Sequence, residues 1–331
     1  PRLDPVRRAI LGAVAETARR QLVESRWSGR LHDPWVLERI AQRFGPHYTW
    51  SASQLEAYAQ NPFVFMLEKL LKLEETEEAE EETSPMSFGS AAHAVLERFY
   101  GGYTGPFPGE LTAVVAARYA ELASQVLGQL ERESEWLGLP VLWALTRHDI
   151  TKRVEEFLAW ELPRLVGRQP HLREHKFGYD DPLTIEGTDT RGAPSRLLLR
   201  GRIDRVDRTD DGALHVLDYK SSSTPSPKGY HDGAALQGPL YMTALKHTVG
   251  GVVATAAYSP IKHPGRKAEV TWGEEAFVRA LAIALSIPAR VREGKFEPLA
   301  AGSMRDWAFW WPGADVCRVT EMLGERSRFD E

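Results

Sequence analysis

The 331-residue sequence contains a single cysteine, Cys317, and this scarcity excludes several kinds of site. One thiol can form no disulfide within the chain and cannot build a cysteine-rich zinc site. No segment approaches the roughly 18 apolar residues of a membrane-spanning helix, and the N-terminus lacks the apolar core of a signal peptide. We therefore expect a cytoplasmic protein with no membrane partner.

The chain also lacks a strong excess of either charge. Lys and Arg number 41 and Asp and Glu 46, which gives a formal net charge of −5. This excludes a surface coated with basic residues, but a catalytic groove needs only local Arg and Lys to bind nucleic acid. There is no Gly-x-x-x-x-Gly-Lys-Ser/Thr loop, so the chain cannot itself be a P-loop motor.

The expected elements separate a helical first half from a strand-rich second half. Apolar residues repeat at helical spacing over residues 5–27, 34–44, 87–100, 112–135 and 142–166. Segments rich in β-formers predict strands over residues 173–179, 195–207, 213–220 and 252–258, with helices over 234–247 and 274–292. A buried strand after a crossover helix favours a mixed sheet in an α/β fold. Because the chain begins with Pro1 rather than Met, we expect a processed or excised piece of a longer protein.

Two acidic residues, Asp204 and Asp218, fall on the two expected strands of a hairpin whose turn is Thr209–Gly212. Alternate residues of a strand share a face, so Asp218 and Lys220 should point the same way. Carboxylates that hold Mg²⁺ or Mn²⁺ beside a lysine suit the attack of water on a phosphodiester. Taken alone, an Asp-x-Lys at a strand end is usually a surface ion pair that contributes roughly 0–1 kcal/mol.

Further motifs accompany this pair in a fixed order along the chain. They are Ser51-x-Ser53-x-Leu55-Glu56-x-Tyr58, Asn61-Pro62-Phe63, Gly89-x-x-x-His93-x-x-x-Glu97, Glu174, Gly201-Arg202-Ile203-Asp204-Arg205, Asp218-Tyr219-Lys220 and Gln237-x-x-x-Tyr241. With these motifs the chain resembles the PD-(D/E)xK nucleases, specifically the RecB-type branch of the RecB and AddB helicase–nucleases and the CRISPR-associated exonucleases. The resemblance covers most of the chain after Trp50.

The resemblance implies a restriction-endonuclease-like α/β fold, with a mixed sheet of four or five strands flanked by helices. It divides the chain into a helical extension (residues 1–48), a helical part with the His motif (49–166), and the nuclease core with a C-terminal clasp (167–331). It implies a metal site for one or two Mg²⁺ or Mn²⁺ ions, held by His93, Asp204, Asp218 and the carbonyl of Tyr219.

The remaining catalytic roles also follow from the resemblance. Lys220 would orient the attacking water, Gln237 and Tyr241 would hold Lys220 or the scissile phosphate, and Glu174 would be an acid of the first core strand. Each residue has a plainer alternative. His93 lies among Ala, Val and Leu, which suits a packed histidine. Glu174 could be a plain charge at the end of a strand. Gln237 could cap a helix, and Tyr241 could make a packing contact. Because Pro239 inside a helix costs about 3 kcal/mol, we expect that helix to start late or to kink.

Candidate DNA contacts lie near the acids. Arg200, Arg202 and Arg205, with Arg196, could bind phosphates, and Tyr230 could stack on bases. The alternative is that these arginines pair with Asp207, Asp210 and Asp211.

The chain departs from the AddB-like pattern where relatives carry cluster-binding cysteines. Asn61 precedes Pro62-Phe63, and Cys317 alone cannot hold a four-thiolate cluster, so no iron–sulfur cluster is expected. We expect Trp307, Phe309, Trp310 and Trp311 to pack on residues 61–63 as a hydrophobic clasp instead.

The expected function is metal-dependent hydrolysis of DNA in repair or recombination, as an exonuclease on single-stranded or unwound DNA. Two alternatives stay open. One is a catalytically silent DNA-binding scaffold, and the other is a nuclease subunit that is active only with a helicase partner.

Overall fold

The structure is a computed structural model that describes residues 4–20, 29–73, 85–133, 140–221, 233, 235–264 and 272–297. Its centre is a six-stranded mixed sheet, built from β1 (Thr49–Ser51), β2 (Arg168–Phe177), β3 (Leu183–Thr188), β4 (Pro194–Thr209), β5 (Leu214–Lys220) and β6 (Val253–Pro260). The α/β class is therefore confirmed. The sheet exceeds the predicted four or five strands because it includes two strands that the sequence did not predict, β1 and β3.

Strand β4 connects the parts of the sheet. Its first half pairs in parallel with β1 and antiparallel with β3, and its second half pairs antiparallel with β2 and β5. Strand β6 then extends the sheet in parallel with β5. The turn between β4 and β5 is the predicted one, and its Gly212 has φ of +86°, a conformation that glycine adopts without strain. Strand β5 thus ends between β4 and β6.

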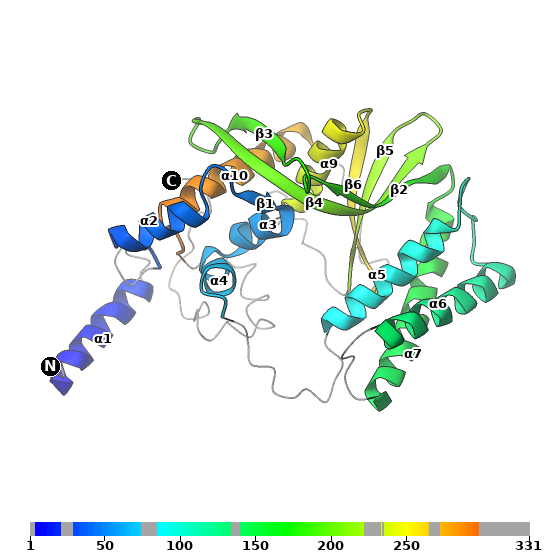
Figure 1. Cartoon of the computed structure of the whole chain (residues 1–331), viewed down its shortest axis with the longest axis horizontal. Helices are drawn as coiled ribbons and strands as arrows, with labels where there is room; N and C mark the ends of the chain where they lie inside the picture. The colour runs from blue at the N-terminus through cyan, green and yellow to red at the C-terminus, as the bar shows by residue number, and fades with distance from the viewer. Residues whose placement is uncertain are drawn as a thin grey trace.

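The helices form groups on different sides of the sheet (Figure 1). One group comprises α2 (Pro34–Arg43), α3 (Ala52–Gln60), α4 (Pro62–Phe65), α9 (Gln237–Thr248) and α10 (Glu274–Arg292). The other comprises α5 (Pro85–Gly101), α6 (Ala113–Glu133) and α7 (Pro140–Glu161). The remaining helical segments are α1 (Pro5–Arg20), a π-helical turn (Met66–Leu70) and a 3₁₀ turn (Leu162–Arg164). Within the described residues, no helix is long and apolar enough to cross a membrane.

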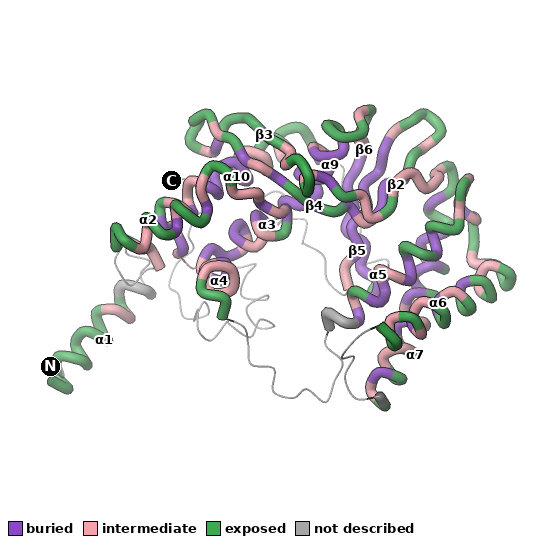
Figure 2. Tube along the Cα trace, viewed as in Figure 1, coloured by how far each residue is buried: buried purple, intermediate pink, exposed green. Residues whose placement is uncertain are grey.

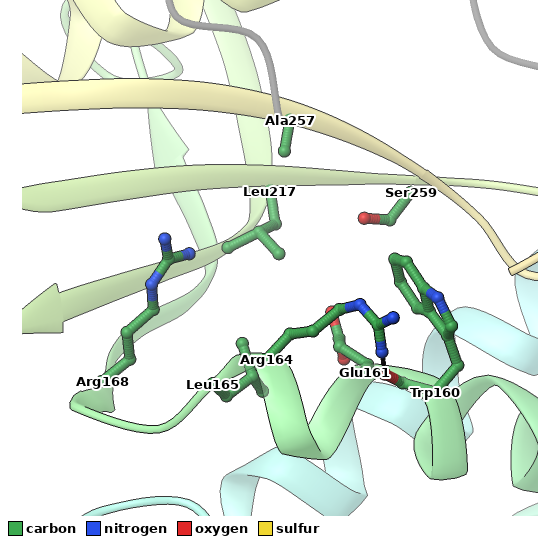
Figure 3. Close-up of a pocket in the computed structure, with 8 residues that line it drawn as sticks. All are labelled: Trp160, Glu161, Arg164, Leu165, Arg168, Leu217, Ala257 and Ser259. Carbon is green, nitrogen blue, oxygen red and sulfur yellow. Dashed lines mark hydrogen bonds between the residues drawn. The ribbon is translucent and has the colours of Figure 1, made fainter. Parts of the chain in front are cut away.

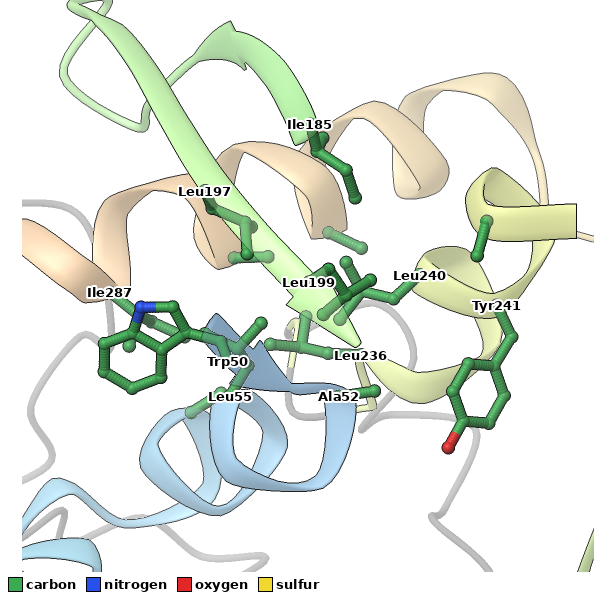
Figure 4. Packing of buried hydrophobic residues seen from close by; sticks show 14 of the residues in the cluster. Trp50, Ala52, Leu55, Ile185, Leu197, Leu199, Leu236, Leu240, Tyr241 and Ile287 are labelled. Carbon is green, nitrogen blue, oxygen red and sulfur yellow. The ribbon is translucent and has the colours of Figure 1, made fainter. Parts of the chain in front are cut away.

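Each helix group buries its own apolar core, seen as purple stretches in Figure 2. The first core packs Trp50, Leu55, Leu199, Leu236 and Ile287 between the sheet and α3, α9 and α10 (Figure 4). These residues come from five separate elements or loops, so the burial that stabilises them also fixes α3 and α9 against the end of β5.

The second core lies among α5, α6 and α7 and receives one side chain from β5, that of Tyr219. The Tyr219 ring meets Phe157 edge-on at 5.8 Å between centroids. Since Tyr219 separates Asp218 from Lys220, this contact anchors the end of β5 to the helical group that carries His93.

Candidate active site

The candidate site begins where β4 and β5 separate. Their register pairs run from Arg208–Leu214 to Arg205–Leu217 and stop there. Beyond this point the Asp204 Oδ2 accepts a hydrogen bond from the backbone N–H of Tyr219 at 2.8 Å. The Asp204 side chain thus takes the place of a backbone acceptor in the β4–β5 ladder. This hydrogen bond holds the Asp204 carboxylate against the Asp218-Tyr219-Lys220 segment.

His93 reaches the same point from α5. Its Nε2 donates to the backbone carbonyl of Tyr219 at 3.2 Å, and its Nδ1 lies 3.6 Å from Asp204 Oδ2. A glycine one turn earlier permits this approach, because a Cβ at Gly89 would lie 2.7 Å from Ser221 Oγ. Burial lowers the pKa of His93, which favours the neutral imidazole that can donate a lone pair to a metal.

Glu174 completes a cluster of potential metal ligands. It lies between the register pairs Arg173–Arg205 and His175–Ile203, and therefore beside Asp204. Ligand atoms of His93, Glu174 and Asp204 all lie within 4.8 Å of one another. The Glu174 backbone has φ of +44°, a left-handed conformation that costs a non-glycine residue on the order of 1–3 kcal/mol and is frequent at functional sites.

The electrostatics of the cluster fit a divalent cation. Burial, and next the charge of Asp218, raise the pKa of Asp204 to about 8. Burial also raises the pKa of Glu174, although Arg202 opposes it. Crowded carboxylates with a neutral imidazole form a donor set for a cation that would offset both effects. The residues present therefore fit the metal that the sequence predicted.

Lys220 is held from two sides at the end of β5. Its Nζ lies 2.6 Å from Asp218 Oδ2 and donates to Gln237 Oε1 at 2.6 Å. Burial lowers the pKa of Lys220, but the charges of Asp218 and Glu56 outweigh this and leave the pKa above its ordinary value. The side chain is thus a protonated hydrogen-bond donor at neutral pH.

Gln237 is the first residue of α9, and Pro239 lies in its first turn. The predicted late start of this helix is confirmed, since α9 begins at Gln237 and not at residue 234. Pro239 then lies in the first turn, where a proline removes an N–H that has no partner within the helix. Tyr241 follows one turn later, is buried, and meets Phe177 edge-on. Burial, and next the carboxylates of Asp218 and Asp204, raise the pKa of Tyr241, so its hydroxyl lies within their field.

Glu56 is a residue of the site that sequence reasoning missed, although it belongs to the first of the motifs. The Glu56 carboxylate is buried in α3 and accepts hydrogen bonds from the backbone N–H groups of Leu236 and Gln237 at 2.7 and 2.9 Å. It therefore anchors the start of α9, and with it Gln237. The available signal was an acid between Leu55 and Tyr58, two residues that the helical pattern buries.

The predicted DNA-contact arginines occupy different environments. Arg202 pairs with Glu174, with Nε 2.6 Å from Oε2, and is half exposed. Arg200 is exposed and lies over the ring of Tyr179 at 5.6 Å. The DNA contact predicted for Arg205 is wrong, because its side chain is 1% exposed, and the alternative of a pair with Asp207 is confirmed. Tyr230 and the proposed tryptophan clasp lie outside the described residues.

Arg205 is the centre of a buried ionic cluster. It donates to Glu161 at 3.0 and 3.2 Å and to Asp207 at 3.1 Å, and it also bonds the Tyr219 hydroxyl. The guanidinium lies 4.0 Å from the ring centroid of Tyr100. Burial raises the pKa of Asp207 to about 6, against the opposing charge of Arg205. The cluster joins α7, β4 and β5 behind the site.

A cavity of about 310 Å³ lies beside this cluster, between the end of α7 and the sheet (Figure 3). Leu217 and Ala257 line it from β5 and β6, and Arg164 and Trp160 line it from the helical side. Adjacent residues of a strand point to opposite faces, so Leu217 points away from the face of Asp218. None of the predicted site residues lines this cavity.

Comparison with known families decides the assignment. The family model of the PD-(D/E)XK nuclease superfamily matches residues 49–319, which include the cluster and the Asp218-Tyr219-Lys220 segment. The chain belongs to this superfamily. The resemblance predicted from the motifs is confirmed.

Curated relatives place the similarity within larger proteins. The chain is 30% identical over 225 residues to an ATP-dependent helicase/deoxyribonuclease subunit of Natranaerobius thermophilus, and 27% identical over 222 residues to that of Leuconostoc citreum. Each alignment covers 63% of this chain but 18% of the relative, so the chain matches about a fifth of their length. A crystal structure of an exonuclease candidate from Eubacterium rectale aligns with a TM-score of 0.38 at 13% identity, covering 82% of this chain and 90% of that one.

Proposed function

We propose that this chain is a divalent-metal-dependent DNA nuclease that hydrolyses phosphodiester bonds of single-stranded or unwound DNA in repair or recombination. The observation that carries the proposal is the convergence of His93, Glu174 and Asp204 within 4.8 Å, beside the Asp218–Lys220 pair. Membership of the nuclease superfamily supports it.

The metal site in this proposal consists of His93, Asp204, Asp218 and the carbonyl of Tyr219, with Glu174 at its edge. Mg²⁺ or Mn²⁺ bound there would polarise the phosphate and lower the pKa of a bound water. The chain prepares the site through two contacts. Asp204 is fixed by the Tyr219 N–H, and His93 by the Tyr219 carbonyl. Both carboxylate and imidazole are thus oriented by the backbone of a single residue.

Lys220 acts on the reacting groups in this proposal. Its ammonium, held by Asp218 and Gln237, donates to the attacking water and stabilises the negative charge that develops on the phosphate oxygens. The raised pKa of Lys220 supports a role as donor rather than as base. Tyr241 lies one helical turn beyond Gln237 and offers a hydroxyl to the same phosphate.

Arg200 and Arg202 supply phosphate contacts next to the reacting centre in this proposal. Both lie on β4 on the same side as Asp204, since alternate residues of a strand share a face. Arg202 is half exposed and already borders Glu174. Contacts of this kind make DNA binding depend strongly on salt.

A second proposal concerns the setting in which the nuclease acts. The names of the two curated relatives combine helicase and deoxyribonuclease, and the chain matches about a fifth of their length. We therefore propose that the chain cuts strands that an ATP-driven helicase supplies, as a domain or subunit of a helicase–nuclease. A catalytically silent scaffold would leave the Asp218–Lys220–Gln237 arrangement without a purpose.

The exonuclease mode can be tested with circular and linear DNA of the same sequence. In Mn²⁺ or Mg²⁺, we expect the chain to degrade an end-labelled linear single strand and to spare the covalently closed circle. Equal loss of the circle and the linear strand would show an endonuclease instead.

The same assay with a helicase and ATP on duplex DNA tests the second proposal. It predicts that the duplex is degraded only when the helicase and ATP are both present.

A further inference from the structure

A second hollow, of about 570 Å³, lies between α5 and α6, which Figure 1 shows side by side. One wall is a stripe of α5 that contains Arg98 and Gly101, and the other is a stripe of α6 that contains Leu122 and Val126. Arg173 of β2 closes one side. We call this hollow the α5–α6 groove.

The groove leads directly from the candidate active site. His93, Glu97 and Gly101 follow one another at four-residue spacing on α5, so the stripe that faces the metal cluster continues into the groove. Eight residues of helix span roughly 12 Å. Arg173 precedes Glu174 on β2, and the charge of Glu97 is among the causes that raise the pKa of Glu174, after burial. Groove and cluster are therefore neighbours.

The groove offers two arginines that have no partner among the described residues. Within the described part of the chain, Arg98 and Arg173 are exposed and make no hydrogen bond or ion pair. Arg118 adds a third guanidinium, which donates to the carbonyl of Gly102 and lies over the ring of Tyr103. Three arginines face Glu97 and Glu133, so the lining carries an excess of positive charge.

The α6 wall of the groove carries an apolar stripe between Arg118 at one end and Gln129 and Glu133 at the other. Leu122, Val126 and Leu130 lie at four-residue spacing on α6 and are only partly buried against the second core. Gly101 and Gly102 leave room at the end of α5, where a Cβ on Gly102 would lie 2.1 Å from Arg118 Nη2. A groove that combines guanidiniums with an apolar stripe along α6 suits a polyanion that also has flat apolar faces.

From this arrangement we infer that the α5–α6 groove holds a single strand of DNA as it approaches the metal cluster, with Arg98 and Arg173 on its phosphates and α6 against its bases. The inference rests on the proposed nuclease function for the identity of the strand. Charge complementarity and continuity with the cluster favour nucleic acid over a partner helix, which would need acidic residues beside its apolar face.

A binding measurement tests the groove independently of cleavage. A fluorescent oligothymidylate is titrated with the Asp218→Asn chain in EDTA at several KCl concentrations. Removing one phosphate contact to a single strand lowers the slope of log Kd against log salt by about 0.7. We expect Arg98→Ala to lower the slope by about that amount and Arg98→Ala/Arg173→Ala by about 1.4. Arg39→Ala is the matched control, an exposed arginine on α2, across the molecule from α6 in Figure 1.

A cleavage measurement separates this inference from the proposed function. We expect the double variant to lower kcat/KM for an oligonucleotide several-fold more than kcat/KM for bis(4-nitrophenyl) phosphate, which is too small to occupy the groove. A wild-type chain that hydrolyses neither compound would overturn the nuclease function, while the salt slope would still show whether the groove binds DNA. A double variant with the wild-type slope and an unchanged ratio of the two kcat/KM values would overturn DNA binding in the groove. The groove would then be a site for a protein partner.

Discussion

Lys220 has its position fixed by two partners with different chemistry. Asp218 supplies charge and Gln237 supplies a neutral acceptor, each 2.6 Å from the ammonium nitrogen. The carboxylate sets the protonation of Lys220, whereas the amide sets its direction. A substitution of Gln237 therefore tests whether the orientation of the Lys220 side chain matters, because it leaves the charge of the site unchanged.

Replacing Gln237 with Ala should slow catalysis without abolishing binding. A hydrogen bond to a charged group contributes roughly 1.5–3 kcal/mol, so we expect kcat for DNA to fall about 10- to 100-fold and KM to change little. Gln42→Ala, at an exposed position of α2, is the control. Equal kcat values for wild type and Gln237→Ala in steady-state assays would show that Lys220 needs no positioning by α9.

Asp204 should make the stability of the folded chain depend on pH. Burial, and next the charge of Asp218, raise its pKa to about 8 in the folded chain, against about 3.9 in an unfolded one. The folded state then holds a proton that the unfolded state releases, so this contribution is complete below about pH 4 and is lost as the pH rises through 8.

The Tm measured in EDTA should therefore fall between about pH 4 and pH 8, and fall less in Asp204→Asn. At pH 8 Mg²⁺ or Mn²⁺ should restore the Tm of the wild type more than that of Asp204→Asn, because the cation offsets the buried charge. Superimposable pH profiles of the two proteins would contradict the assigned pKa.

Arg205 shows where reasoning from neighbouring positions failed. The sequence grouped it with Arg200 and Arg202 because all are close to Asp204 along the chain. Adjacent residues on a strand point to opposite faces, so the side chain next to Asp204 points into the second core rather than toward DNA. The partner Glu161 lies 44 positions away on α7, and no local pattern reveals such a pair.

At the scale of elements, α3 positions α9 through one buried carboxylate. Glu56 accepts the N–H groups of Leu236, the N-cap of α9, and of Gln237, its first residue, and neither N–H has a partner within the helix. The carboxylate also lies at the positive end of the α9 dipole. Helix α3 therefore contributes to the site although none of its residues belongs to the metal cluster.

Glu56→Ala should destabilise the fold and weaken the site together. Leaving a buried donor unsatisfied costs roughly 1–3 kcal/mol, so the free energy of unfolding in urea should fall by about that amount. Glu56→Gln keeps an acceptor oxygen and should lose less. If both variants unfold at the wild-type urea concentration, the carboxylate does not anchor α9.

The buried cluster of Arg205 should be more sensitive still. Arg205→Ala leaves Glu161 and Asp207 buried without their cation, and breaking such a group costs roughly 3–5 kcal/mol. Arg208→Ala, an exposed change on the same strand, is the control. Urea unfolding measures both free energies, and a loss for Arg205→Ala no larger than the control would show that the cluster does not stabilise the fold.

Elements were predictable where their pattern was long enough. The β4–β5 hairpin carried a turn signal and alternating faces, and the His93 helix carried apolar residues at helical spacing. Strands β1 and β3 were both missed. For β1 the reason is its length, because the three residues Thr49–Ser51 show no periodicity. It forms because β4 offers an edge beside Leu198–Arg200, a contact that exists only in the folded chain.

At the scale of the whole molecule, two apolar cores meet at the candidate site. The first fixes α3 and α9, which hold Lys220, and the second fixes α5, which holds His93. The sequence motifs named His93, Asp204, Asp218 and Lys220, but they revealed neither Glu56 nor this division. The side chains that α7 buries, among them Arg205 and Tyr219, come from distant segments of the chain, and local sequence patterns do not reveal such contacts. The domain boundaries proposed at residues 48 and 166 remain predictions.

The most direct measurement is cleavage of end-labelled single-stranded DNA in Mn²⁺, Mg²⁺ or EDTA by the wild type and by Asp218→Ala. We expect the wild type to cut with either metal and not in EDTA. Asp218→Ala should lower the rate by about 100-fold or more, because it removes both a ligand and the partner of Lys220. Cutting that persists in EDTA, or that Asp218→Ala leaves at the wild-type rate, would contradict a metal-dependent nuclease centred on these residues.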